Sequence, residues 1–191
     1  RQRQMCIRDR YIADEGKYPE NIGMVFWSGS NMRSHGQCIA EFLYFMGIKP
    51  VWEKGSLQVK RLEVIPLSEL MRPRIDVTAR ISGLFRDTMP TVVELLDKAV
   101  LLAADLNESE DDNYIKKHIS EESSLMEKSG MTHEESWRNA AYRIFGDAPG
   151  TYGAGVSALL ESRNWQTVDD LADVFVPVSY THLRAHETSL H

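Results

Sequence analysis

The amino-acid sequence predicts an α/β fold, with strands and helices alternating in the first half and helices dominating the second. A short apolar run at Asn21–Trp27 precedes a helical stripe, Ile75–Ile81 alternates strictly between apolar and polar residues, and a regular amphipathic helix follows Pro90. Strand–helix–strand order is typical of an open sheet. We therefore expect a Rossmann-like (flavodoxin-like) open sheet in residues 13–106 and a mainly helical portion in residues 107–176.

Each element of the first half has its own pattern. Asn21–Trp27 has strand length and is apolar almost throughout, as buried strands are. In Arg33–Met46 apolar residues recur at helical spacing until Gly47. The expected elements are, in order, a strand at Asn21–Trp27, a loop at Ser28–Asn31, a helix at Arg33–Met46, strands at Lys49–Trp52 and Arg61–Leu67 around a turn at Gly55, a short helix at Glu69–Met71, a strand at Ile75–Ile81, and a helix capped by Thr88 that extends to Ala103.

The second half reads as helices separated by loops. An acidic loop at Asn107–Asp112 precedes a helix at Asn113–Lys128. Thr132 and Glu135 form a capping box. The helix that they open is expected to carry Trp137, Ala140, Ala141, Ile144 and Phe145 on one face. A glycine-rich stretch follows at residues 146–155, and short helices at Val156–Glu161 and Val168–Phe175 complete the pattern.

The two ends differ from the middle. Residues 1–12 are basic and residues 177–191 hold half of the six histidines, and neither segment has helix or strand periodicity. Both resemble translated sequencing adapters, so we interpret them as non-native flanks and leave them out of the fold prediction.

Composition excludes several classes of protein. The chain has 191 residues, a net charge of −6 and two cysteines, Cys6 and Cys38. No apolar run approaches the roughly 20 residues of a membrane span, two cysteines make no disulfide framework, and an acidic chain is a poor nucleic-acid binder. We expect a soluble cytoplasmic protein that binds no nucleic acid.

The arginine-rich strand is the most informative segment. Its polar residues share one face and comprise Arg74, Asp76, Thr78, Arg80 and Ser82. One interpretation is an edge strand whose polar face is solvated or salt-bridged. The other is a cleft wall that offers guanidinium groups to an anionic ligand. Gly83 then permits a turn, and Arg86 and Asp87 fall near the carboxyl end of the strand, where open α/β sheets bind ligands.

Other candidate sites carry weaker signals. The amides of Ser28–Asn31 follow a strand and precede a helix, so they could hold an anion. His35 and Glu41 are candidate metal ligands, although their spacing fixes no geometry. Residues 146–155 are either a loop close to a ligand or a simple helix-breaking turn. The sequence has no phosphate-binding glycine motif and no recognisable catalytic triad.

Four motifs resemble the CobN/magnesium-chelatase H-subunit family, whose members are large subunits of cobaltochelatase and magnesium chelatase. They are GKYPENIGMVFWSGSNMRSHG, FMGIKPVWE, EVIPLSELMRPRIDVTARISGLFRD and RIFGDAPGTYGAGVSALLESRNW. The resemblance extends from about Gly16 to Val176. The glycine-rich form of the last motif, and ARISG in the third, favour the cobalt branch.

The resemblance implies a ligase that forms nitrogen–metal bonds, inserting Co²⁺ into the tetrapyrrole hydrogenobyrinic acid a,c-diamide in cobalamin biosynthesis. It implies that ATP is hydrolysed by separate AAA+ type partner subunits, which agrees with the missing phosphate loop. Family large subunits are several times longer, so we expect an internal fragment that is inactive alone. The alternatives are a magnesium chelatase H subunit, which inserts Mg²⁺ into protoporphyrin IX, and a non-catalytic docking or scaffold module presenting Glu108–Asp112 and Glu121–Glu122.

Under this resemblance we assign hypothetical roles to the candidate residues. Arg74, Arg80 and Arg86 hold substrate carboxylates, with Ser82 and Gly83 beside them. Asp76 and Asp87 are the candidate catalytic groups, which orient the arginines or handle protons. His35 and Glu41 remain weak candidates for the metal.

Overall fold

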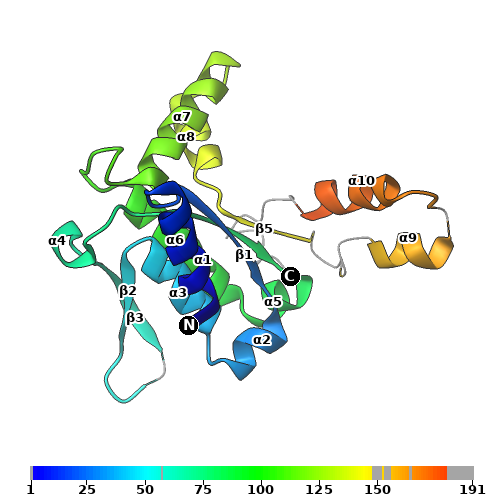
Figure 1. Ribbon diagram of the computed structural model, residues 1–191, viewed down its shortest axis with the longest axis horizontal. Coiled ribbons are helices and arrows are strands. Elements are labelled where there is room, and N and C mark those ends of the chain that lie inside the picture. The colour runs from blue at the N-terminus through cyan, green and yellow to red at the C-terminus, as the bar shows by residue number, and fades with distance from the viewer. Residues whose placement is uncertain (1, 57, 148–151, 153–155, 164, 180–191) are drawn as a thin grey trace.

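A computed structural model of the protein describes residues 2–56, 58–147, 152, 156–163 and 165–179 (Figure 1). The strands are β1 (Asn21–Phe26), β2 (Ile48–Trp52), β3 (Val59–Val64), β4 (Asp76–Ile81) and β5 (Ile144–Gly146). The helices are α1 (Gln2–Glu15), α2 (Ser28–Arg33), α3 (Gln37–Phe45), α4 (Leu67–Leu70), α5 (Gly83–Thr88), α6 (Pro90–Ala104), α7 (Tyr114–Lys128), α8 (His133–Ala140), α9 (Val156–Ser162) and α10 (Val168–Ser179).

Three parallel strands form the main sheet in the order β1-β4-β5. β1 and β4 pair along their whole length, from Asn21 opposite Asp76 to Phe26 opposite Ile81. The short β5 pairs with the carboxyl half of β4. The α/β prediction is confirmed. The arginine-rich strand is the central strand among those described, so the edge-strand interpretation of its position was wrong.

One face of this sheet forms the core. Met24 and Phe26 of β1 lie beside Val77, Ala79 and Ile81 of β4, and all five are buried. Helices α3 and α6 cover this face, α3 contacting β1 and β4, and α6 contacting β5. The ring of Phe26 packs edge-on against Phe42 of α3 and Phe85 of α5, at centroid distances of 6.1 and 5.6 Å.

The expected helix Arg33–Met46 is two helices. α2 begins at Ser28, so the predicted loop at Ser28–Asn31 is its first turn. His35 and Gly36 adopt left-handed backbone conformations, with φ of 53° and 81°, and separate α2 from α3. Glycine adopts this conformation without steric cost, so Gly36 is where the chain breaks.

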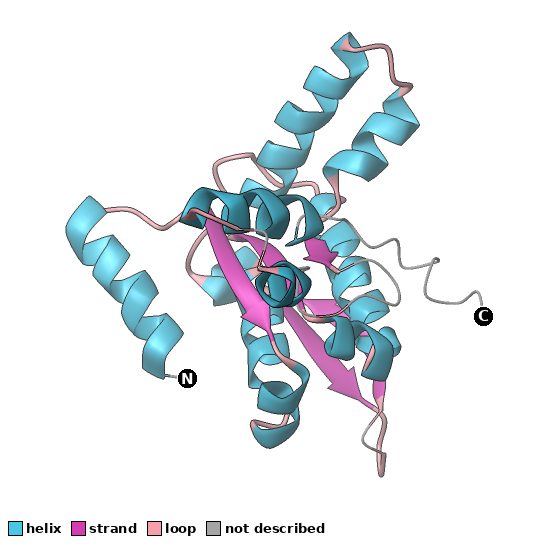
Figure 2. Cartoon of the chain, turned by 90° about the vertical axis from the view of Figure 1, so that its right-hand side faces the viewer, coloured by secondary structure: helices cyan, strands magenta, loops and turns pink. Residues whose placement is uncertain are grey.

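Two further segments differ from the prediction. Helix α8 ends at Ala140, and Ile144 and Phe145 form β5, because pairing with β4 satisfies their backbone groups. Residues 2–15 form helix α1, although residues 1–12 lack helical periodicity in the sequence; Figure 2 shows α1 standing apart from the other elements. That the two ends are non-native stays a prediction, and residues 180–191 lie outside the described part.

The remaining helices follow their sequence signals. Asn113 caps α7 through its side chain, and the Thr132–Glu135 capping box is present at α8. α6 begins at Pro90, but Met89 takes the N-cap position and supplies no side-chain hydrogen bond, because Thr88 is the last residue of the unpredicted helix α5. α7 and α8 project together from one end of the molecule, and the antiparallel β2–β3 hairpin projects from the other (Figure 1). Among the helices described, none combines the length and the apolar character that crossing a membrane requires.

Candidate functional site

The carboxyl ends of β1 and β4 meet at one edge of the sheet, where the Ser82 amide donates to the Phe26 carbonyl at 3.0 Å. The Ser82 hydroxyl accepts a hydrogen bond from the Phe85 amide at 3.2 Å and so caps α5. Gly83 is the buried first residue of that helix. These two residues turn the chain from β4 into α5, which carries Arg86 and Asp87.

Arg86 and Asp87 form a two-point ion pair at this edge. Arg86 Nε and Nη2 donate to the two carboxylate oxygens of Asp87 at 2.6 and 2.9 Å. The Tyr152 hydroxyl donates to Asp87 Oδ2 at 2.6 Å. Arg86 is only 3% exposed, whereas the Asp87 side chain is 38% exposed. The arginine therefore positions a carboxylate that faces solvent.

These hydrogen bonds set the charge of Asp87. The guanidinium of Arg86, and then the Tyr152 hydroxyl, lower the pKa of Asp87 below its ordinary value because both donate to its ionised form. The same contact raises the pKa of Tyr152, because ionising it would place a second negative charge beside Asp87. Asp87 is thus a carboxylate at neutral pH, suited to receive a cation or an N–H donor and poorly suited to keep a proton.

Arg80 and Asp147 form a second ion pair beside the first. Arg80 Nη2 donates to Asp147 Oδ1 at 2.8 Å, and Asp147 is buried. Arg86 Nη1 also donates to the Asp147 carbonyl, at 2.6 Å. Asp147 therefore joins the end of β5 to both arginines. We call Arg80, Arg86, Asp87, Asp147 and Tyr152 the carboxyl-edge cluster.

Arg74 lies at the opposite end of the arginine-rich segment and is fully buried. Two of its N–H groups bind the carboxylate of Glu108 at 2.7 and 2.8 Å. The others bind the carbonyl oxygens of Met46, Gly47 and Ile65 at 2.8 to 3.2 Å. All five donors of the guanidinium are thus used inside the protein. This geometry favours a structural role for Arg74 over the predicted role of binding a substrate carboxylate.

Asp76 is also buried and belongs to a charge network at the amino edge of the sheet. Its carboxylate accepts hydrogen bonds from Arg143 Nε at 2.8 and 3.0 Å. His118 Nδ1 lies 2.8 Å from Asp76 Oδ2, and its Nε2 lies 3.5 Å from a Glu20 oxygen that also binds Lys117. Since β4 separates Asp76 from the carboxyl-edge cluster, the structure does not bring Asp76 and Asp87 together as two catalytic groups.

This network predicts a pH-dependent stability. The hydrogen bond to Asp76 raises the pKa of His118 above its usual value, against the opposing effects of burial and of Arg143. Protonated His118 therefore stabilises the fold fully below about pH 6.5, and that contribution is lost as the pH rises through the higher folded pKa. We expect His118→Gln to lower the melting temperature more below about pH 6 than above about pH 8.

Thermal unfolding of both proteins across this range measures the effect. The exposed His133, which contacts Glu127 on the protein surface, supplies the control His133→Gln. An equal loss for His118→Gln at both ends of the range would contradict the assignment.

The two candidate metal ligands do not form a metal centre among the described residues. His35 is exposed in the link between α2 and α3, and Glu41 lies on α3, where it accepts a hydrogen bond from Gln37 at 2.8 Å. No group of three or more His, Cys, Asp or Glu side chains with metal-binding geometry occurs in the described part of the chain. The described residues therefore supply no third ligand for the predicted metal site at His35 and Glu41.

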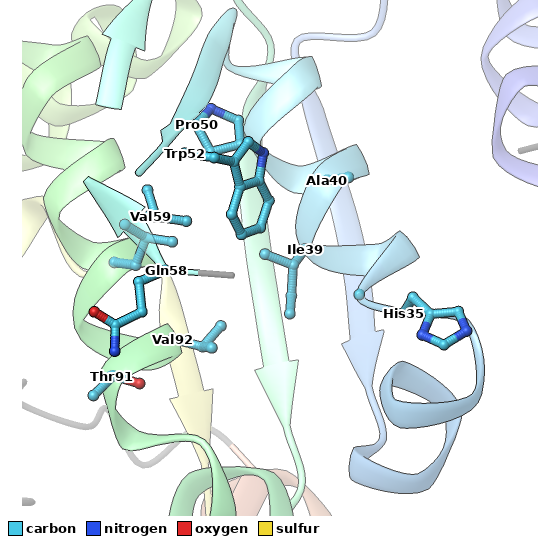
Figure 3. A pocket seen from close by; sticks show the side chains of 11 residues that line it. His35, Ile39, Ala40, Pro50, Trp52, Gln58, Val59, Thr91 and Val92 are labelled. Atoms are coloured by element: carbon cyan, nitrogen blue, oxygen red, sulfur yellow. The ribbon is translucent and has the colours of Figure 1, made fainter. Parts of the chain in front are cut away.

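A groove of about 620 Å³ lies between α3, the β2–β3 hairpin and α6 (Figure 3). Its walls are mainly apolar, and Trp52 stands over one end while His35 lies at the other. Gln58 and Thr91 add polar groups. The volume and composition fall in the range of small-molecule sites, but the described lining holds neither a lysine nor an arginine.

The acidic segments considered for docking are partly used inside the molecule. Glu108 binds Arg74, and Glu122 contacts Arg143 at 3.3 Å. Glu110 and Glu121 line a shallow surface depression with Lys128. The docking alternative therefore retains a smaller acidic surface than the sequence indicated.

Sequence reasoning missed several members of these clusters. His118 and Arg143 surround Asp76, while Asp147 and Tyr152 complete the carboxyl-edge cluster. Asp147 and Tyr152 belong to the glycine-rich stretch, which was the signal that could have found them. Most of residues 146–155 lies outside the described residues.

Comparisons with known proteins match nearly the whole chain. A family model described as CobN/Magnesium Chelatase matches residues 4–187. The chain is 42% identical over 173 residues to the aerobic cobaltochelatase subunit CobN of a Sinorhizobium species, covering 91% of the chain and 13% of that relative. It is 52% identical over 168 residues to the uncharacterized protein MJ0908 of Methanocaldococcus jannaschii, covering 88% and 14%.

A chloroplastic magnesium-chelatase subunit ChlH of Oryza sativa subsp. indica is 38% identical over 165 residues, covering 86% of the chain and 11% of the relative. Among solved structures, the catalytic subunit of cobaltochelatase from Mycobacterium tuberculosis has a TM-score of 0.78 and 40% identity, covering 92% of this chain and 15% of that one. The chain thus spans between 11% and 14% of the three curated relatives.

Proposed function

The chain belongs to the CobN/magnesium chelatase family, and from that premise we propose that it is part of the large subunit of a cobaltochelatase. The reaction is the insertion of Co²⁺ into hydrogenobyrinic acid a,c-diamide, with ATP hydrolysed by AAA+ type partner subunits. The higher identity to CobN, 42% against 38% for rice ChlH, supports cobalt over magnesium. The cytoplasmic location and the inactivity of the chain alone stay predictions.

The observation that carries this proposal is the carboxyl-edge cluster. An ionised carboxylate, Asp87, faces solvent where α/β sheets bind ligands, and buried Arg86 fixes its position. Metal insertion brings a divalent cation to a macrocycle whose nitrogens must lose protons. We assign Asp87 to the incoming metal ion, because a carboxylate that resists protonation is a good oxygen ligand.

The three arginines predicted to bind substrate then have different roles. Arg80 is the one we assign to a substrate carboxylate, because its side chain is partly exposed and Asp147 holds its guanidinium at the end of β4. Arg86 is a positioning residue for Asp87. Ser82 and Gly83 shape the turn that brings α5 to this edge. We assign Arg74 and Asp76 a structural role, because their buried ion pairs stabilise the fold.

A magnesium chelatase H subunit acting on protoporphyrin IX is the second candidate, favoured by the 38% identity to rice ChlH. The two candidates differ in the tetrapyrrole that the chain should prefer. The carboxyl-edge cluster is compatible with both, because both tetrapyrroles carry carboxylates.

Titrating the chain with each tetrapyrrole tests the proposal. We expect hydrogenobyrinic acid a,c-diamide to bind more tightly than protoporphyrin IX, and Arg80→Gln to weaken its binding about tenfold, the loss of one charge-assisted hydrogen bond. The change in visible absorbance of the tetrapyrrole measures the dissociation constant. Arg61→Gln, which removes an exposed hairpin arginine paired with Glu63, is the matched control.

Three results would count against these assignments. Preference for protoporphyrin IX would favour the magnesium alternative. Equal affinities of Arg80→Gln and the unaltered chain would remove Arg80 from the site. Failure of the folded chain to bind either compound would reject the substrate assignment for this segment.

A further inference from the structure

Among the described residues, one face of the main sheet is left exposed along β1. Met24 and Phe26 point into the core, whereas the alternate residues Asn21, Gly23 and Val25 are exposed. Val25 is 54% exposed, and Trp27, the next residue in this alternation, is 60% exposed. Strands of parallel sheets are usually buried on both faces, so two large apolar side chains on an open face call for an explanation.

Strand register extends this surface across the sheet. Val25 pairs with Arg80, which pairs with Phe145, so these three residues form one row on the same face. Gly23 pairs with Thr78 in the row before. A Cβ atom built on Gly23 would meet no atom within 4 Å. The surface of the sheet at Gly23 is therefore flat, and no side chain covers it among the described residues. Thr78, Arg80 and Phe145 are half-buried, and α10 contacts β5, so the exposure is greatest along β1. We call Gly23, Val25, Trp27, Thr78, Arg80 and Phe145 the open sheet face.

The charged side chains on this face are paired among the described residues, and Arg80 binds Asp147 at 2.8 Å. Arg80 lies between the apolar Val25 and Phe145. The other charged residue on the same side of β4 is Asp76, which is buried at the far end and paired with Arg143 and His118. A flat apolar surface bordered by a partly exposed guanidinium, which Asp147 holds in place, suits a flat ring system that carries carboxylates at its periphery.

The open sheet face is continuous with the carboxyl-edge cluster. Trp27 directly precedes Ser28, whose hydroxyl lies 2.9 Å from that of Thr88, the residue after Asp87. Arg80 belongs to both surfaces. A ligand on the open sheet face therefore ends at the edge where the ionised Asp87 is held.

We propose that the open sheet face binds the flat side of the tetrapyrrole, with Trp27 stacking on the ring and Arg80 pairing with a peripheral carboxylate. This inference rests on the proposed function for the identity of the ligand. The α3–hairpin–α6 groove is the rival location. It is apolar and carries Trp52, but its described lining has no lysine or arginine to meet a carboxylate.

Gly23→Leu is the main test. The new side chain enters open space and replaces a glycine inside a strand, so the fold should keep its stability. It should nevertheless obstruct a flat ligand, and we expect the dissociation constant for hydrogenobyrinic acid a,c-diamide to rise at least about tenfold. Trp27→Leu should raise it about fivefold through lost stacking. Absorbance titration gives the affinities, and thermal unfolding checks the fold.

The groove supplies matched control substitutions, Ala40→Leu on the exposed surface of α3 and Trp52→Leu on β2. Loss of affinity in the Gly23 and Trp27 variants alone supports the inference. Loss in the groove variants alone, or no change in any variant of a chain that binds the tetrapyrrole, overturns the inference and leaves the proposed function standing. If the unaltered folded chain binds no tetrapyrrole, the proposed function and this inference both fall.

Discussion

Replacing Arg74 with alanine is expected to destabilise the protein by about 3–5 kcal/mol, the usual cost of breaking a buried ion pair. The substitution removes five hydrogen bonds at once. It leaves the Glu108 carboxylate without its guanidinium partner and three carbonyl oxygens without this donor. Urea unfolding of the 191-residue chain measures the loss. Because many domains are stable by only about 5–15 kcal/mol, a loss of this size leaves little margin.

Two comparisons separate this structural role from substrate binding. Arg61→Ala removes an exposed arginine on the hairpin and should cost less than about 1 kcal/mol. Gly47→Ala should also destabilise, because Gly47 has a φ of 71° and its new Cβ would collide with the Arg74 guanidinium. Unchanged stability of Arg74→Ala, combined with weaker tetrapyrrole binding, would return Arg74 to the substrate site.

The sequence pattern identified the arginine-rich strand correctly but not its position in the sheet. Alternation at Ile75–Ile81 depends on local residues only, and the structure confirms it as β4. What makes β4 central is β5, three residues long and more than 60 positions later in the chain. A strand that short leaves no periodicity, and Ile144 and Phe145 also fitted the apolar stripe of the preceding helix.

The roles of the charged residues depended on partners that are distant in sequence. Arg74 binds Glu108, 34 positions away, while Asp76 binds Arg143 and Arg80 binds Asp147, each 67 positions away. Spacing along one strand shows that these charges share a side, but it does not show which of them are neutralised. The pair Arg86–Asp87 was the exception, because its members are adjacent in the chain and lie on one short helix.

The family assignment came from a different kind of information. Four extended motifs carried the resemblance, and the comparisons confirm it over residues 4–187. A resemblance carried by motifs of this length does not depend on predicting each helix correctly, and it held although the expected helix Arg33–Met46 is split into α2 and α3. They do not assign a role to each residue, which is why geometry separates Arg80 and Asp87 from Arg74 and Asp76.

Asp87→Asn is expected to raise the KM for Co²⁺ about 10- to 100-fold in the assembled chelatase that carries this segment, since an amide would replace the charged oxygen that we propose as a ligand. The tetrapyrrole dissociation constant should stay nearly unchanged, because we assign those contacts to Arg80 and the open sheet face. Steady-state chelation at varied metal concentration, with absorbance titration of the tetrapyrrole, measures both quantities. Asp111→Asn, on the exposed acidic loop, controls for the loss of one negative charge.

The pattern of these effects distinguishes a metal ligand from a scaffold residue. Tyr152→Phe removes one donor to Asp87 but leaves the Arg86 ion pair, so it should raise the pKa of Asp87 and increase the metal KM mainly at acidic pH. A lowered pKa means that the carboxylate stays charged as the pH falls, and the KM of the unaltered enzyme should change little there. Equal losses of tetrapyrrole and metal binding in Asp87→Asn would instead show that Asp87 maintains the shape of the edge, because loss of a metal ligand should affect the metal more than the tetrapyrrole.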